Sequence, residues 1–228
     1  MTSGLVQHYD GINNTSSGHS SSATVWKDLA GTNDGILKPA IGGNLTWTSN
    51  CLQFSSGAVV FSGEITNFYT IMGVALAKDV GTYPRIVDGS PINGTNNNTF
   101  PGFYIVRTDG ASQASKIFRI YGHGLDAPFV PTVPAIFDKR FHYAYRFDGA
   151  KIDLFINGEW KGSINSTAVP NDKTSVLLGA GDISGRYLSG EICNFMRYDR
   201  ALTSSEIAQN ALVDNMRFIN PSSPLQIT

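Results

Sequence analysis

The stretch FHYAYRFDGAKIDLFINGEWKGSI, residues 141–164, decides the fold class, because apolar and polar positions alternate in it around two turn signals. Such alternation predicts strands that turn one face toward a core. Asp148-Gly149 is a favoured two-residue hairpin turn. The predicted cross-strand pairs are Phe147 with Ala150, Tyr145 with Ile152 and Tyr143 with Leu154. The segment therefore predicts an antiparallel hairpin with a core face and a polar face.

The two faces of this hairpin differ in chemistry. The core face carries Phe141, Tyr143, Tyr145, Ile152 and Leu154. The opposite face carries His142, Ala144, Arg146, Lys151, Asp153 and Phe155. We expect the second face to point away from the core of the domain.

The second turn, Asn157-Gly158, allows two registers. A two-residue loop would put Trp160 and Ile164 on the polar face of the hairpin. A three-residue loop, with Gly158 left-handed in a bulge, reverses the parity and buries both side chains. We predict the bulge and therefore a buried Trp160.

The rest of the chain repeats short apolar runs between turn residues, and its 24 Gly and 15% charged residues suit strands joined by tight turns. The run FYTIMGVALA, residues 68–77, is apolar on both alternating sets and predicts a central strand. The regular spacing of the runs predicts an all-β, two-sheet sandwich. A chain of 228 residues can bury such a core as one domain, which we place at residues 1–218, with an extended tail at 219–228.

One helix signal stands out near the C-terminus, in TSSEIAQNALVDNMRF from Thr203. Thr203 and Glu206 have the spacing of a capping box, in which each side chain binds a free backbone N–H of the first turn. We predict one C-terminal helix of about three turns that begins near Ser204.

Charge and hydropathy exclude two classes of partner. The net charge of −1 gives no positive field that would gather phosphates, so we expect no nucleic acid partner. No apolar segment approaches the ~20 residues of a membrane span, and we expect no membrane insertion. The N-terminus MTSGLVQHYDG has no charged region followed by an apolar run, so we expect no export signal in the chain as given. Cys51 and Cys193 are either paired once or two buried thiols.

Motifs for catalysis are missing from the sequence. Neither a Glu-x-Asp-x-Glu strand, which would place two carboxylates ~5 Å apart, nor a Gly-x-Ser-x-Gly elbow occurs. The four histidines lack metal-binding spacing, which makes a zinc site improbable. We therefore predict a protein that is not an enzyme.

Several motifs together resemble a known family. They are the opening YDG, SSATVWKDLAGTNDGIL, LTW, LQF, the hairpin DLFINGEWKGS and the closing GEICNFMRYDRALTSSEIAQN. From about Gly4 to Phe218 the chain resembles the laminin-G-like, concanavalin A-like lectin/glucanase family. The resemblance implies a jelly roll of two curved antiparallel sheets, and binding of glycans or proteins rather than their cleavage.

The resemblance also implies roles for residues of the N-terminal region. Trp26 and Trp47 are expected as core anchors that pin the polar loop between Asp10 and Thr24. Members of the family often hold structural Ca²⁺ near such loops. The expected ligands are Asp10, Asn33, Asp34 and Asp199, whose oxygen atoms suit this ion. The alternative is that these residues cap their own backbone in Asx-turns.

A glycan site is expected on the polar face of the hairpin and the loops at its rim, because sugars bind to aromatic faces with a few polar groups. The predicted ligand-binding residues are Tyr83, Arg85, Tyr121, His123, Phe129, His142, Arg146, Asp153 and Phe155. The alternative is a solvated strand face, with loop aromatics that cover core edges or meet a partner subunit.

Domains similar to this family appear in bacteriophage surface proteins, and the resemblance therefore implies a non-catalytic surface module of a bacteriophage virion, as a head fibre, decoration or tail-associated protein. Its expected partners are host or mucosal glycans, cell-surface polysaccharide and other virion proteins, and its expected location is the virion surface or the extracellular space. The resemblance leaves two alternatives, a carbohydrate-binding module of a secreted bacterial protein and a divergent glycoside hydrolase.

Overall fold

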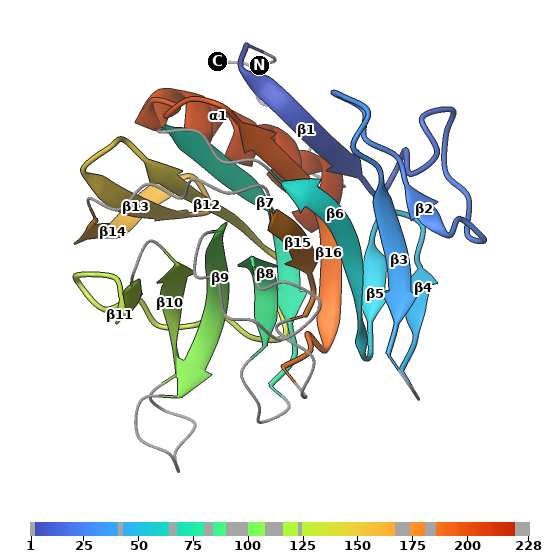
Figure 1. The fold of residues 1–228 in the computed structure, drawn as a ribbon, viewed down its shortest axis with the longest axis horizontal. Helices are drawn as coiled ribbons and strands as arrows, with labels where there is room; N and C mark the ends of the chain where they lie inside the picture. Colours follow the sequence, from blue (N-terminus) through green and yellow to red (C-terminus); the bar gives the residue numbers. More distant parts are fainter. Residues whose placement is uncertain are drawn as a thin grey trace.

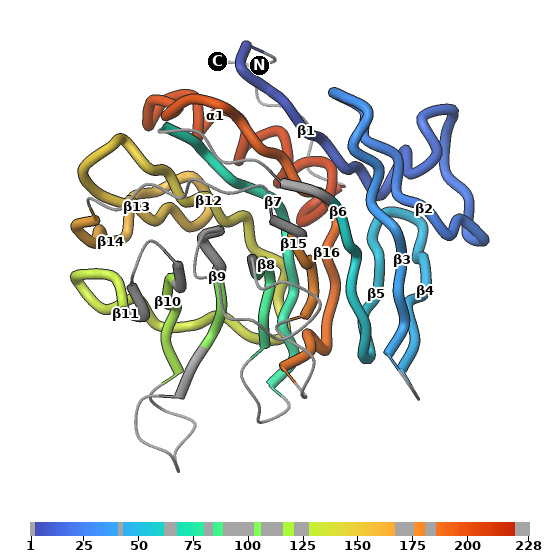
Figure 2. Tube along the Cα trace, in the orientation of Figure 1, coloured from blue at the N-terminus to red at the C-terminus, as the bar shows by residue number. Residues whose placement is uncertain are grey.

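Two antiparallel β-sheets stack face to face and form the body of the protein, with helical turns near the C-terminus (Figure 1). The computed structural model describes residues 3–40, 43–63, 68–79, 84–89, 100–107, 116–122, 125–166, 174–180 and 186–221. Figure 2 follows the chain, which crosses between the two sheets several times. The predicted all-β sandwich with one C-terminal α-helix is confirmed.

The first sheet lies under the α-helix, and we call it the helix-side sheet. Its strands, in spatial order, are β14 (Glu159–Asn165), β13 (Lys151–Ile156), β12 (Phe141–Phe147), β7 (Tyr69–Ala77), β16 (Gly190–Tyr198), β5 (Leu52–Phe54) and β4 (Leu45–Trp47). β1 (Leu5–Asp10) pairs with β16 on the same side as β5. Strand β7 lies between β12 and β16 and is buried along almost its whole length, which confirms the predicted central strand.

The second sheet lies on the other side of the core, and we call it the far sheet. Its strands, in spatial order, are β11 (Leu125–Pro128), β10 (Lys116–Gly122), β9 (Phe100–Arg107), β8 (Arg85–Gly89), β15 (Thr174–Leu178), β6 (Gly57–Gly63), β3 (Gly35–Pro39) and β2 (Val25–Trp26). All the described pairings in both sheets are antiparallel, and several join strands far apart in the sequence, such as β1 and β7 with β16.

Aromatic side chains fill the space between the sheets. The ring of Phe103 in the far sheet stacks on Tyr143 of the helix-side sheet, with centroids 5.3 Å apart, and on Phe118, at 5.1 Å. Offset aromatic pairs at these distances stabilise a core beyond the burial of their area. Both layers are therefore held by direct ring contacts across the core.

The two N-terminal tryptophans are core anchors, as the family resemblance implies. Trp26 is fully buried, and its indole meets that of Trp47 at 5.0 Å, edge to face. The Trp26 indole N–H donates to the backbone oxygen of Asp10, and that of Trp47 donates to the backbone oxygen of Ala23. The polar loop between β1 and β2 is therefore fixed at both of its ends.

The first hairpin has the predicted faces but a different register. Phe147 pairs with Ile152, and Tyr145 pairs with Leu154, two residues away from the predicted partners. The carboxylate of Asp148 accepts hydrogen bonds from two backbone N–H groups inside the turn, which makes the loop four residues long. A shift of two residues keeps each side chain on its face, so the predicted core face is confirmed.

The prediction of a buried Trp160 is wrong. Asn157 and Gly158 both have left-handed backbones, and the strands pair directly on either side of them, as in a two-residue turn. The bulge follows one pair later, after Trp160, so Trp160 lies on the polar face and is 51% exposed. Beyond the bulge, Ile164 packs against the core as predicted.

The helix begins where the capping box predicts. α1 (Ser204–Asp214) has Thr203 as its N-cap, and the side chains of Thr203 and Glu206 bind each other's backbone N–H. A single π-helical turn, η2 (Asn215–Ile219), continues it. Ile219, where the predicted tail begins, is the last residue of this turn, and an extended tail stays a prediction because residues 222–228 lie outside the described part of the chain.

A disulfide joins Cys51 to Cys193 across 142 residues of sequence and settles the pairing that the sequence left open. Both cysteines are fully buried in a small cluster with Val74 and Phe218. Within the described residues, no helix is long and apolar enough to cross a membrane.

Candidate functional site

The polar face of the first hairpin does not form an open binding surface, because α1 covers it. His142 and Phe155 are almost completely buried. Phe155 and Ala144 pack with Ile207 of the helix in a second apolar cluster. The expectation of an exposed face is therefore wrong, and the reason is that the strand face and the helix bury each other's apolar side chains.

Two of the predicted ligand-binding residues on this face, Arg146 and Asp153, join the two strands of the hairpin to the segment that leads into the helix. The Arg146 guanidinium donates to the Asp153 carboxylate at 2.6 Å and to the backbone oxygen of Leu202 at 2.8 Å. Burial of Asp153 opposes its ionisation, but hydrogen bonds from Ser163 and Arg146 outweigh burial and keep its pKa below the ordinary value. A charged, fully paired carboxylate in this position suits a structural role.

The loop aromatic Phe129 also lies away from the surface. Its side chain is fully buried in the main core cluster. This placement agrees with the alternative in which loop aromatics cover core edges. Tyr83 and His123 lie outside the described residues, as does the side chain of Tyr121.

The remaining predicted ligand-binding residue, Arg85, lies on the outer face of the far sheet, and a β-bulge after it brings Asp88 to the same face. Arg85 pairs with Tyr104 and Val87 pairs with Phe103, so two steps along β8 match one step along β9. Ile86 and Val87 consequently both point into the core. The extra residue returns Asp88 to the outer face, where its carboxylate lies 3.3 Å from the Arg85 Nε.

Three side chains form a row across neighbouring strands of this outer face. Tyr104 pairs with Arg85 on one side and with Arg119 on the other, and directly paired residues share a face. The Arg85 guanidinium lies 3.8 Å from the centre of the Tyr104 ring, within cation–π distance. Arg85, Asp88 and Tyr104 are nearly buried and form the floor of the row, whereas Arg119 is half-buried.

An apolar strip continues the same face toward the other end of the sheet. Asp88 pairs with Leu177, Leu177 with Val60, and Val60 with Ile36, which is half exposed. The outer face of the far sheet therefore joins an arginine–tyrosine row to an apolar strip. We take the row and Asp88 as the candidate site.

Sequence reasoning found Arg85 but missed Asp88, Tyr104 and Arg119. The alternation within FYIVR and IFRIYG already places Tyr104 and Arg119 on the face opposite to their apolar neighbours. The bulge in β8 cannot be recognised in the sequence, because the consecutive apolar residues Ile86 and Val87 do not show whether one or both of them face the core.

The predicted calcium ligands serve separate networks. Asp10 accepts a hydrogen bond from the backbone N–H of Ile12 in an Asx-turn, and its second oxygen pairs with the Arg217 guanidinium at 2.5 Å. Asp34 pairs with the ammonium of Lys27 at 2.5 Å. The alternative of local backbone capping therefore applies to Asp10.

The three predicted aspartates do not come together as a metal site in the part of the chain that the structure describes. Asn33 uses its backbone oxygen to accept the hydroxyl of Tyr9, and Asp199 lies beside Gly4. Among the described residues, the grouping with metal-ligand distances is Cys51, Glu191 and Cys193, whose sulfur atoms are bonded to each other. These residues do not gather at one site among the described residues, and binding of Ca²⁺ stays a prediction.

Comparison with known proteins places this geometry in a family. A profile of the concanavalin A-like lectin/glucanases superfamily matches residues 74–208, more than half of the chain. No curated protein is significantly similar in sequence.

Solved structures share the fold at low sequence identity. Trypanosoma rangeli sialidase in complex with sialic acid superimposes with a TM-score of 0.67 and 19% identity, over 93% of this chain and 33% of the sialidase. This chain thus spans about a third of that enzyme's length. Domain 4 of AbnA, an extracellular arabinanase of Geobacillus stearothermophilus in complex with arabinotriose, gives 0.64 and 17%, over 91% of this chain and 98% of that domain.

The binding domain of botulinum neurotoxin DC in complex with SialylT gives a TM-score of 0.63 and 10% identity, over 93% of this chain and 52% of that one. At such identities the likeness concerns the fold. The sandwich, the topology and the profile match agree with one another, and the chain belongs to the concanavalin A-like lectin/glucanase superfamily.

Proposed function

We propose that this protein is a non-catalytic glycan-binding module and that the glycan binds over the outer face of the far sheet. The row Arg85–Tyr104–Arg119 carries the proposal. The half-buried Arg119 guanidinium supplies hydrogen-bond donors for sugar hydroxyls, above a nearly buried floor in which Arg85 stacks on Tyr104. The Asp88 carboxylate on the same face lies 3.3 Å from the Arg85 Nε and holds the guanidinium in place.

The fold neighbours support a glycan rather than a protein ligand. The sialidase, the arabinanase domain and the neurotoxin domain were each solved with a bound sugar or sugar analogue as named above. Domain 4 of AbnA is matched along nearly its whole length, and this favours, as a second candidate, a carbohydrate-binding module that belongs to a larger secreted protein.

The absence of catalysis is part of the proposal and rests on the carboxylates. Glycoside hydrolysis of the usual kind needs two of them, about 5 Å apart in retaining enzymes and further apart in inverting ones. Among the described side chains on the strands of the far sheet, Asp88 is the carboxylate of the outer face. On the helix-side sheet Asp153 is buried, and so is Asp214 at the end of α1, which covers that sheet.

We further propose that the module is displayed outside the cell, on a bacteriophage virion. The support is the resemblance to domains of phage surface proteins, together with a disulfide that is buried and joins distant segments. Mass spectrometry of purified particles, against the lysate from which they come, tests this part independently of glycan binding.

A glycan array tests the binding function. We expect the wild type to bind a defined group of oligosaccharides, with sialylated and arabinan-derived probes included. Replacing Arg119 with Ala should weaken binding by about tenfold or more, as loss of a hydrogen bond from a charged group does. Lys38→Ala is the matched control, because it removes an exposed cation from the other end of the same sheet. Equal binding by Arg119→Ala, or no glycan bound by the wild type, would contradict the proposal.

A further inference from the structure

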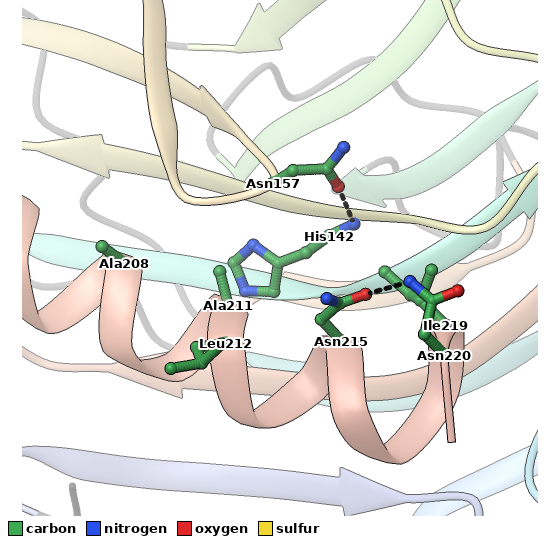
Figure 3. Close-up of a pocket in the computed structure, with 8 residues that line it drawn as sticks. All are labelled: His142, Asn157, Ala208, Ala211, Leu212, Asn215, Ile219 and Asn220. Carbon is green, nitrogen blue, oxygen red and sulfur yellow. Dashed lines mark hydrogen bonds between the residues drawn. The ribbon is translucent and has the colours of Figure 1, made fainter. Parts of the chain in front are cut away.

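A cavity lies on the opposite side of the molecule from the candidate site, between α1, η2 and the β13–β14 turn (Figure 3). Its volume is about 460 Å³, within the range of small-molecule sites. The lining residues are His142, Asn157, Ala208, Ala211, Leu212, Asn215, Ile219 and Asn220. None of them belongs to the far sheet.

Small residues produce this cavity. Gly158 has a φ of +83°, and a Cβ there would lie 3.1 Å from the Cβ of Ala211. The turn therefore contacts the helix closely at Ala208 and Ala211, and the cavity opens beside this contact. Leu212 is 56% exposed and lines the same cavity, so part of its wall is in contact with solvent.

His142 gives the cavity a polar wall. It is fully buried, and neither of its ring nitrogens has a hydrogen-bond partner in the described part of the chain. Its backbone is fixed, because the backbone N–H donates to the side-chain oxygen of Asn157 and its carbonyl accepts the Asn157 N–H. In Figure 3 the imidazole lies between the strand and the helix. Burying a polar group without a hydrogen bond costs free energy, so a ligand that supplies the missing hydrogen bond to His142 would be favoured.

The carboxyl group of Asp214 lies near the imidazole. The Nε2 of His142 is 3.6 Å from the Oδ2 of Asp214, and the other oxygen of Asp214 accepts the side-chain amide of Asn194. Burial lowers the pKa of His142 to about 3, so the ring is neutral at physiological pH. A neutral imidazole has one N–H donor and one acceptor nitrogen, so His142 can accept a hydrogen bond from a ligand.

The other polar groups of the lining are uncharged as well. Asn215 and Asn220 bind each other through one amide hydrogen bond of 2.9 Å, and each amide has further donor or acceptor capacity. Ala208, Ala211, Leu212 and Ile219 form an apolar wall. A ligand that fits must offer hydroxyl donors to His142, carry no net charge, and present C–H groups to the apolar wall.

We propose that this cavity binds a small uncharged ligand rich in hydroxyl groups, of the size of one sugar residue, and that His142 accepts a hydrogen bond from one of its hydroxyls. This site is separate from the proposed glycan site, since the helix-side and far sheets lie on opposite sides of the core. It can exist whether or not the far sheet binds a glycan.

Nuclear magnetic resonance of the histidine rings tests the proposal directly, because the chain contains only four histidines. The full-length, ¹⁵N-labelled protein is titrated to high millimolar concentrations with methyl α-D-glucopyranoside, methyl β-D-galactopyranoside and N-acetylglucosamine. We expect at least one of these probes to shift the ring signals of His142 in a saturable way. Sialic acid, which is charged, should shift them less.

Two tryptophan variants locate the binding event. Ala208→Trp fills the cavity and should abolish the shift of His142, whereas Gln209→Trp, on the exposed side of the same helix turn, should retain it. If Ala208→Trp does not fold, Leu212→Trp serves in its place. Arg119→Ala should leave the shift unchanged, which separates this site from the far sheet. The proposal is overturned if no neutral probe shifts the His142 signals, or if the shift persists in the variant with the filled cavity.

Discussion

Removal of the disulfide should destabilise the protein more than any single substitution on its surface. The bond closes a loop of 142 residues, from the strand β5 region to the last strand. In the chain-entropy treatment a loop of this length stabilises the folded state by about 5 kcal/mol at room temperature. Residual structure in the unfolded chain lowers this value, and we expect about 3 to 5 kcal/mol for Cys51→Ala/Cys193→Ala. Domains of this kind have total stabilities of roughly 5 to 15 kcal/mol.

Urea unfolding measures this effect. The wild type is unfolded with and without a reductant, and the double variant serves as the control for any other action of the reductant. Reduction should lower the midpoint of the wild type and leave that of the variant unchanged. The small cavity left by the two Ala side chains adds to the variant's loss, so the reduced wild type should be the more stable of the two. A loss below about 1 kcal/mol on reduction would refute the reasoning.

Four further predictions follow from the described contacts. Replacing His142 with Gln leaves Asp214, whose pKa is raised to about 7 by burial, so the variant's free energy of unfolding should rise as the pH falls from 7 toward 4. Replacing Asp214 with Asn leaves the depressed pKa of His142, and stability should fall as the pH drops from 6.5 toward 3; pH-dependent urea midpoints decide both signs. Trp26→Ala should cost about 3 to 5 kcal/mol and Trp160→Ala less than about 1, and similar values would show that the second turn has the other register. Gly158→Ala should cost more than about 1 kcal/mol through its left-handed backbone and its contact with the helix, as read from thermal melting.

The faces of the strands could be predicted from the sequence, and the registers could not. Alternation fixes which side chains share a face, and a shift of two residues in the first hairpin leaves that assignment unchanged. The register depends on the turn, where the Asp148 carboxylate binds two backbone N–H groups and lengthens the loop. The face on which Trp160 lies depends on whether the bulge comes before or after it along β14. The local sequence is compatible with either position of the bulge.

The helix could be placed along the chain but not in space. Thr203 and Glu206 predicted its first turn, since a capping box is a local arrangement. Its docking on the polar hairpin face depends on tertiary contacts of Gly158 with the helix and of Phe155 with Ile207. A signal was present, because Phe155 on a face read as polar needs an apolar partner. Alternation alone, without an apolar partner for Phe155, predicts that His142 and Phe155 lie on an open surface.

The candidate site depends on an irregularity that no pattern in the sequence reveals. Arg85 and Asp88 would lie on opposite faces of a regular strand, and the bulge at Ile86 and Val87 brings them together. Bulges of this kind are frequent beside functional sites because they redirect a side chain.

A crystal structure of the protein with the oligosaccharide that binds most strongly on the array tests the central proposal most directly. We predict that the sugar lies on the outer face of the far sheet, in contact with Arg119 and over Tyr104. A sugar bound only in the cavity beside α1, or at the exposed Trp160, would contradict the assignment of the far sheet as the glycan-binding surface.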